Sequence, residues 1–224
     1  SREPARASFA QERLFFLERL EPGRAIYNAP TCLELRGALD ARALERAIQC
    51  IVERHSALRT TFRLSDGRLV QHVQPDPSSV LEFVDFSALA PAERAERVQA
   101  LGRSEARRPF DLERGPLLRA TLVRSSRDHH HLFVNMHHIV VDAWSLGLFH
   151  RELEQNYAAL AAGKSAVFPT LPIDYADFSE WQRERHSAGG FDADLAYWAE
   201  RLAGAPALLE LPTDRPRPLE LVHR

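Results

Sequence analysis

A pair of histidines followed closely by an aspartate is the part of the sequence best suited to chemistry. His137 and His138 end a β-forming run at residues 131–136, and Asp142 precedes apolar residues with helical spacing. The pair is therefore expected where a strand ends and a helix begins. Because successive strand side chains point to opposite faces, we expect one ring to face a cleft and the other to enter the packing behind it.

Three interpretations of this stretch are open: a metal site, a structural helix cap and an acyl-transfer site. The metal site is the least favoured, because zinc ligands must converge to about 2.0–2.2 Å from the ion, whereas adjacent strand histidines diverge. The run from His129 to His131 adds histidines, but the chain has no His-Glu-x-x-His motif. We therefore expect no metal-ligating residues.

The other two interpretations use the start of the helix differently. As a helix cap, Asp142 accepts hydrogen bonds from first-turn amides, and the histidines are structural. In an acyl-transfer site, one histidine handles a proton and a helix N-terminal amide, such as that of Ala143, faces a developing oxyanion. A serine triad is disfavoured, because Ser145 lies inside the first turn and no Gly-x-Ser-x-Gly sequence is present.

The hydrophobic pattern predicts both strands and helices around this stretch. Strands are expected at 31–36, 59–64, 68–74, 81–86, 117–124 and 130–136, with hairpin turns at 65–67 and 125–128. Helices are expected at 8–17, 40–52, 91–107, 143–162, 175–185 and 192–203. The second hairpin delivers the histidine pair to its place.

Composition narrows the classes of function. The chain of 224 residues can bury a core, and its net charge of -2 disfavours binding to nucleic acid or an anionic membrane. It has no apolar stretch of membrane-spanning length and no signal peptide at its start, so we expect a cytoplasmic protein. Cys32 and Cys50 form neither a metal-type pair nor a disulfide framework, and we expect buried thiols.

The segment from His137 to Ser145 resembles the His-His-x-x-x-Asp-Gly motif of condensation domains in nonribosomal peptide synthetases. Three further stretches are similar to other motifs of that family, in the same order: Ser8 to Leu17, Arg54 to Thr60 and Tyr175 to Trp181. The end of the chain, through Pro218, resembles the passage into the family's second lobe. Four ordered motifs make this resemblance far more specific than a histidine pair alone.

The resemblance implies an α/β fold, a two-layer sandwich like a lobe of chloramphenicol acetyltransferase, with a mixed β-sheet covered by helices. Residues 1–205 would form the N-terminal lobe, and residues 206–224 a linker toward a second lobe that is absent from this chain. In the family the site lies in a tunnel between the two lobes. The isolated chain is therefore expected to fold but to be inactive.

The same resemblance implies an acyltransferase of secondary metabolite biosynthesis. It would form an amide bond between a donor acyl or peptidyl thioester and the amine of an acceptor aminoacyl thioester. Donor and acceptor peptidyl carrier proteins would present both substrates on phosphopantetheine arms, with no cofactor bound directly. The second lobe and neighbouring synthetase domains would be further partners.

Matching the motif positions also implies roles for individual residues. His138 would position the amine or accept its proton, and His137 would point into the structure and support the backbone. Asp142 would form a structural ion pair with Arg59. Trp144 would give further structural support, and the amide of Ala143 is a candidate oxyanion donor.

Two positions depart from the family pattern. Ala143 stands where the family usually has glycine, and Ser56 where it usually has glutamate; the added methyl group narrows the cleft. Two rival functions remain: a non-catalytic docking lobe for carrier proteins, which the intact His138 and Asp142 disfavour, and a stand-alone acyltransferase, which the linker-like end disfavours.

Overall fold

The computed structural model describes residues 4–75, 80–206, 211–212 and 214–215. The chain forms two compact units, Ser1–Glu180 and Trp181–Arg224, and their boundary lies inside helix α5 (Tyr175–Ser187). The predicted boundary at residues 205–206 stays a prediction, and most of the predicted linker lies outside the described residues.

A four-stranded mixed sheet forms the centre of the first unit. Its strand order is β2 (Asn28–Arg36), β7 (His129–His137), β6 (Leu118–Ser126) and β5 (Leu81–Asp85). The pair β5 and β6 is parallel, whereas β6–β7 and β2–β7 are antiparallel. The hairpin predicted to deliver the histidine pair is confirmed as β6–β7.

A smaller antiparallel sheet has the order β1 (Ala5–Arg6), β4 (Arg68–Val73) and β3 (Thr60–Ser65). Helix α1 (Phe9–Leu20) follows β1, and its capping residue Ser8 accepts a hydrogen bond from the Gln11 amide at 3.2 Å. The hairpin β3–β4 is as predicted. Strand β1 was not predicted, because a two-residue strand is too short to show periodicity.

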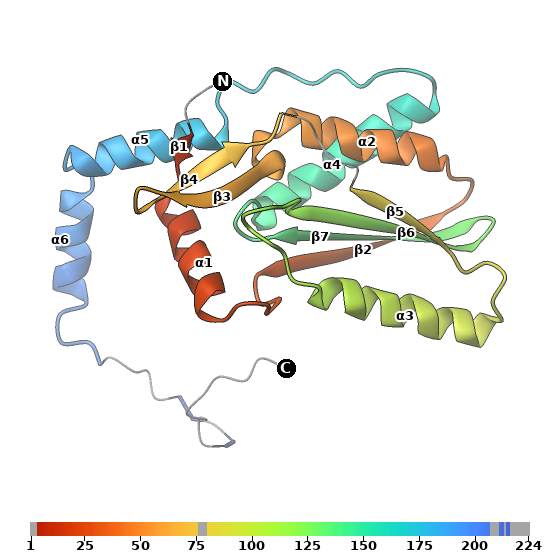
Figure 1. Ribbon diagram of the computed structural model, residues 1–224, viewed down its shortest axis with the longest axis horizontal. Helices are drawn as coiled ribbons and strands as arrows, with labels where there is room; N and C mark the ends of the chain where they lie inside the picture. The colour runs from red at the N-terminus through yellow and green to blue at the C-terminus, as the bar shows by residue number, and fades with distance from the viewer. Residues whose placement is uncertain (1–3, 76–79, 207–210, 213, 216–224) are drawn as a thin grey trace. The chain divides into compact units, whose positions relative to one another are not determined.

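Helices cover both faces of the four-stranded sheet, as Figure 1 shows. Helices α2 (Ala41–Arg54) and α4 (Ala143–Ala161) pack on one face, where their apolar stripes join alternate strand residues in one core. That core includes Leu44, Ile48, Ile51, Leu118, Leu122, Leu132, Val134, Met136, Phe149 and Leu153. The predicted stripe of α2 is confirmed, because burying residues three and four apart requires a helix.

Helix α3 (Pro91–Arg107) lies on the opposite face. A β-carbon at Gly102 would lie 2.7 Å from the ring of Phe133 on β7, so the glycine permits this close approach. Asn135 donates a side-chain hydrogen bond to the carbonyl of Glu105 at 2.8 Å. The predicted α/β fold with a mixed, helix-covered sheet is confirmed, and α3 adds cover on the second face.

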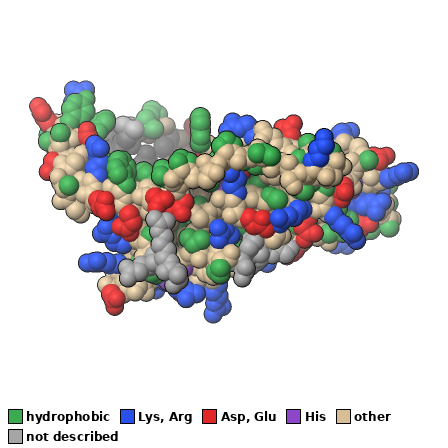
Figure 2. Space-filling view, turned by 90° about the horizontal axis from the view of Figure 1, so that it is seen from above, with side chains coloured by type: hydrophobic (Ala, Val, Ile, Leu, Met, Phe, Trp, Pro, Cys, Tyr) green, Lys and Arg blue, Asp and Glu red, His purple; other side chains and the backbone are tan. Residues whose placement is uncertain are grey.

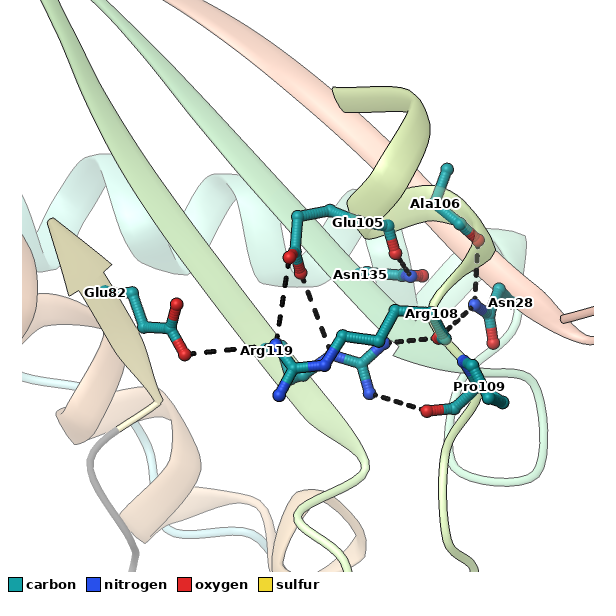
Figure 3. A network of polar contacts seen from close by, with 8 residues as sticks. All are labelled: Asn28, Glu82, Glu105, Ala106, Arg108, Pro109, Arg119 and Asn135. Atoms are coloured by element: carbon teal, nitrogen blue, oxygen red, sulfur yellow. Dashed lines mark hydrogen bonds and ion pairs between the residues drawn. The ribbon is translucent and has the colours of Figure 1, made fainter. Parts of the chain in front are cut away.

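A polar network joins the end of α3 to β2, β6 and β7 (Figure 3). Asn28 donates to the carbonyls of Ala106 and Arg108, at 2.8 and 2.9 Å. Arg119 donates to the carbonyl of Pro109 at 3.1 Å, and its guanidinium lies 3.7 Å from the ring centroid of Phe110. Because Phe110 also meets the ring of His137 edge-on, the network supports the packing around that histidine.

In the second unit, helix α6 (Asp192–Arg201) follows the end of α5. Arg185 lies 5.7 Å from the Trp181 ring centroid and 5.2 Å from that of Phe191, which are cation–π distances. These contacts fix the turn between the two helices.

The molecular surface mixes charges of both signs. Figure 2 shows Lys and Arg side chains interspersed with Asp and Glu over the visible face. Across the part of the chain that the structure describes, no helix has the length and apolar character needed to cross a membrane. The expectation of two buried thiols is wrong for Cys32, which is exposed on β2; Cys50 is partly exposed. Strand alternation places Cys32 on the face of Glu34 and Arg36, opposite Leu33 and Leu35, which pack against the core.

Candidate active site

His137 ends β7 and turns into the protein. Its side chain is almost fully buried, and Nδ1 accepts a hydrogen bond from the backbone N–H of Ile139 at 3.0 Å. The ring therefore holds the backbone of the loop that follows the strand. This is the placement that strand geometry predicted for one member of the pair.

Burial decides the charge of His137. It lowers the pKa of His137 from 6.5 to about 4, and the neighbouring His138 adds to the shift. The carboxylate of Glu18 lies 3.7 Å from Nε2, beyond hydrogen-bonding distance. A neutral imidazole at this separation forms no ion pair, and Nε2 is a buried nitrogen without a hydrogen-bond partner among the described residues.

His138 leaves the strand and is exposed. Its backbone N–H donates to the carbonyl of Tyr27 at 2.9 Å, and its Nδ1 lies 3.2 Å from the carbonyl of Val141. A carbonyl only accepts hydrogen bonds, so this contact places the proton of the neutral ring on Nδ1. Nε2 then carries the lone pair. The geometry gives His138 an oriented nitrogen that can accept a proton.

Asp142 caps helix α4. Its Oδ1 accepts hydrogen bonds from the backbone N–H of Ser145 at 2.8 Å and from the Ser145 hydroxyl at 2.6 Å. The hydroxyl bond is the main reason that the pKa of Asp142 is lowered, and the amide bond adds to it. The structural helix cap predicted as one interpretation is therefore present.

The expected ion pair between Asp142 and Arg59 is not formed in the described part of the chain, and the reason lies in the surroundings of Arg59. Its guanidinium donates to the backbone carbonyl of Val52 at 3.0 Å and to that of Gln74. These bonds tie the end of α2 and the end of β4 to the short helix η1 (Ser56–Arg59). Arg59 thus supports the lobe by donating hydrogen bonds to backbone carbonyls, whereas the Asp142 carboxylate caps the N-terminus of α4.

Two other expected residues differ in their surroundings. Trp144 is 81% exposed and packs against little of this lobe, so its expected supporting role stays a prediction. Ala143 is the exposed first residue of α4. The neighbouring carboxylate of Asp142 already binds a first-turn amide, and an oxyanion there would face a like charge. The oxyanion role of Ala143 stays a prediction.

One cavity brings together residues from all four motif stretches. It has a volume of about 570 Å³ and lies wholly within the first unit. The residues that line it include Ala10 from the first stretch, His55 and Ser56 from the second, His138 and Asp142 from the third, and Tyr175 and Phe178 from the fourth. The exposed histidine therefore faces a cavity whose walls come from segments that are distant in sequence.

A buried amide network fixes these segments against one another. The Nε2 of Gln11 donates to Oε1 of Gln71 at 3.2 Å and lies 3.5 Å from the carbonyl of Ile139. The Nε2 of Gln71 donates to the Ser179 hydroxyl at 3.0 Å. Helix α1, strand β4, helix α5 and the histidine loop are thereby joined by side chains that are almost fully buried.

Sequence reasoning did not identify Glu152. This buried carboxylate on α4 accepts from Arg54 at 3.1 Å and contacts Nε2 of His55 at 2.7 Å, so it joins α4 to the end of α2 beside the cavity. A signal was available, because Glu152 falls between Phe149 and Leu153 on the apolar stripe of α4. A charge on that stripe indicates a buried partner.

The chain matches the sequence model of a family described as "Condensation domain", over residues 2–221. It is 46% identical over 211 residues to a linear gramicidin synthase of Brevibacillus parabrevis, and the match covers 94% of this chain and 3% of that protein. The chain thus spans a small part of the curated relatives that it matches.

Two solved structures are similar. The first condensation domain of the CDA synthetase is 26% identical with a TM-score of 0.78, covering 95% of this chain and 53% of that one. The X-domain from teicoplanin biosynthesis, solved as a complex with OxyB, is 30% identical with a TM-score of 0.80, covering 97% and 47%. This chain therefore corresponds to about half of each.

Proposed function

Because this chain belongs to the condensation-domain family, we propose that it supplies the histidine-bearing wall of a site that forms amide bonds. The donor is an acyl or peptidyl thioester and the acceptor is the amine of an aminoacyl thioester. The observation that carries the proposal is His138, with Nδ1 held by the Val141 carbonyl and the ring facing the cavity.

In this proposal the two histidines have separate roles. His138 uses the lone pair of Nε2 to orient the acceptor amine or to accept a proton from it as the amine attacks the thioester carbonyl. The neutral, buried His137 holds the amide of Ile139 and so shapes the loop that carries His138. Asp142 fixes the start of α4, which forms the neighbouring wall.

Holding two substrates in place supplies much of the acceleration in reactions of this kind. We propose that peptidyl carrier proteins present both substrates on phosphopantetheine arms, and that a second lobe completes the enclosure. The isolated chain would then bind but not condense them. From its membership of this family, we also propose that the chain is cytoplasmic.

The test is product formation by His138→Ala in the complete two-lobe protein, supplied with loaded donor and acceptor carriers. Loss of a general base typically slows a reaction by about a hundredfold or more, and we expect a fall of that size. His72→Ala is the matched control, because His72 lies on β4 and does not line the cavity. Turnover close to wild type in His138→Ala would refute the role of His138.

A second candidate function, docking without chemistry, is favoured by one observation. The similar X-domain was solved in complex with OxyB, so a protein of this fold can serve as a binding partner. The same reconstitution separates the two functions, because a docking lobe binds loaded carriers but gives no product even with both lobes intact. A stand-alone acyltransferase would instead accept soluble thioesters as readily as carrier-bound ones.

A further inference from the structure

A second group of chemically capable side chains lies far from the cavity, at the other end of β7. His129 and His131 are two residues apart on this strand, so their rings project from the same face. Glu34 on β2 is the cross-strand partner of His131. One potential ligand atom from each of the three residues lies within 4.8 Å of the other two.

The contacts within this group are close. The Nε2 of His129 lies 2.6 Å from Oε1 of Glu34, and the ring centroids of His129 and His131 are 4.7 Å apart. Burial lowers the pKa of His131, and the adjacent His129 adds to the shift. The Ser125 hydroxyl lies 3.2 Å from its Nδ1 and can orient that ring.

We propose that Glu34, His129 and His131 form a binding site for a divalent transition-metal ion of the zinc class. Two imidazoles and a carboxylate are a ligand set that zinc uses, with a further coordination position left for water. Ligands about 2.1 Å from a tetrahedral ion lie about 3.4 Å apart, so side-chain shifts of roughly 1 Å convert the observed arrangement into a bound one.

The argument from sequence against a metal concerned neighbouring strand residues, whose rings diverge. It does not apply to residues two apart, nor to a ligand from another strand. His130 illustrates the difference: it lies between the two proposed ligands, faces the opposite way and is buried. The site is thus distinct from the histidine pair, which lies at the far end of the same strand.

Arg36 opposes the bound ion. Its guanidinium lies 2.7 Å from Oε1 of Glu34, so it competes for the carboxylate and adds a positive charge beside the site. Removing this charge should therefore tighten metal binding, whereas removing a ligand should weaken it. Changes in metal affinity of opposite sign, from substitutions at neighbouring residues, test the site more sharply than a loss of binding alone.

The experiment is calorimetric titration of the untagged, chelator-treated 224-residue chain with Zn²⁺ alone. We expect one ion per chain and a rise in melting temperature, because a ligand that binds only the native state stabilises it. His129→Ala, His131→Ala and Glu34→Gln should each weaken binding by at least about tenfold. Arg36→Gln should strengthen it.

Three controls keep the ligand set falsifiable. His72→Ala removes a histidine elsewhere, Cys32→Ser removes the exposed thiol on β2, and His130→Gln removes the neighbouring ring; all three should retain binding. Circular dichroism checks that each variant is folded. No binding by the wild-type chain, or unchanged binding in all three ligand variants, would overturn the proposal. Loss of binding in Cys32→Ser would overturn the three-residue ligand set.

Discussion

The two ends of β7 carry the same residue type in opposite environments. At the amino end, the side chain of His129 is 33% exposed and contacts the carboxylate of Glu34. At the carboxyl end, His137 is almost fully buried, and the carboxylate of Glu18 lies beyond hydrogen-bonding distance. The first environment favours an imidazole that can exchange its partner for an ion. The second favours a ring that is neutral at pH 7 and holds the backbone amide of Ile139.

The comparison shows that position along a strand does not determine what a histidine does. Desolvation penalises the imidazolium at the buried end, whereas the ring at the other end lies partly in water beside a carboxylate. His138, one residue beyond His137, combines parts of both environments, because it is exposed but held by a carbonyl. Predictions for His137 and His129 test this contrast, and a prediction for Asp142 tests the helix cap that follows the histidine pair.

The largest expected effect is a dependence of stability on pH that arises from His137. Its folded-state pKa is about 4, whereas its ordinary value is 6.5, so between these pH values the unfolded chain binds the proton and the native chain does not. The stabilising contribution is present above pH 6.5 and is lost as the pH falls toward 4. The full loss corresponds to about 3 kcal/mol.

Urea unfolding of the wild-type chain and of His137→Gln, measured from pH 7.5 to pH 4, tests this prediction. The variant should be less stable at pH 7.5 but should lose less of its free energy of unfolding as the pH falls. Parallel curves for the two proteins would show that His137 is not the titrating group.

A smaller effect is expected at Asp142. Loss of a helix cap costs about 1 kcal/mol, whereas breaking a buried ion pair with Arg59 would cost roughly 3–5 kcal/mol. Asp142→Ala should therefore lower the free energy of unfolding by about 1 kcal/mol, and Asp142→Asn, which can still cap, by less.

A double-mutant cycle distinguishes the two possibilities for Asp142. The effects of Asp142→Ala and Arg59→Ala should add, because the two side chains share no partner among the described residues, whereas Asp142→Ala and Ser145→Ala should be coupled through their hydrogen bond. Strong coupling between Asp142 and Arg59 would show that the two side chains form an ion pair.

The smallest effect is expected at the exposed end of the strand. His129→Ala in metal-free solution should leave the melting temperature close to that of the wild type, because exposed pairs contribute little. Differential scanning calorimetry with a chelator present is the measurement. A marked fall in melting temperature without metal would show that the His129 contact with Glu34 is structural, and the contrast between the two strand ends would weaken.

The periodic elements were accessible from sequence because burial imposes their periodicity. The stripe of α2, the hairpin β6–β7 and the capping position of Asp142 all follow from local patterns. The hydrogen-bond partners of individual side chains did not follow from such patterns. Arg59 bonds to the carbonyls of Val52 and Gln74, and no local pattern indicates which main-chain oxygens a guanidinium will reach.

The other features that sequence did not predict depend on contacts between segments that are distant in the chain. Glu34 and His131 are brought together by the register of β2 on β7, which is set only when the sheet forms. Exposure of Cys32 and Trp144 likewise depends on which neighbours cover each face. Glu152 was more accessible, because a carboxylate on an apolar stripe already indicates a buried partner.

The amide network of Gln11, Gln71 and Ser179 constrains how pieces of related proteins can be recombined. A chimera with a crossover between α1 and β3 takes Gln11 from one parent and Gln71 and Ser179 from the other. If the second parent lacks the matching acceptor, a buried amide loses its partner at a cost of roughly 1–3 kcal/mol, close to the loop that carries His138. Exchangeable blocks in this lobe are therefore defined by hydrogen-bonded neighbours in space, and residues 8–17, 68–73 and 175–180 should be inherited together.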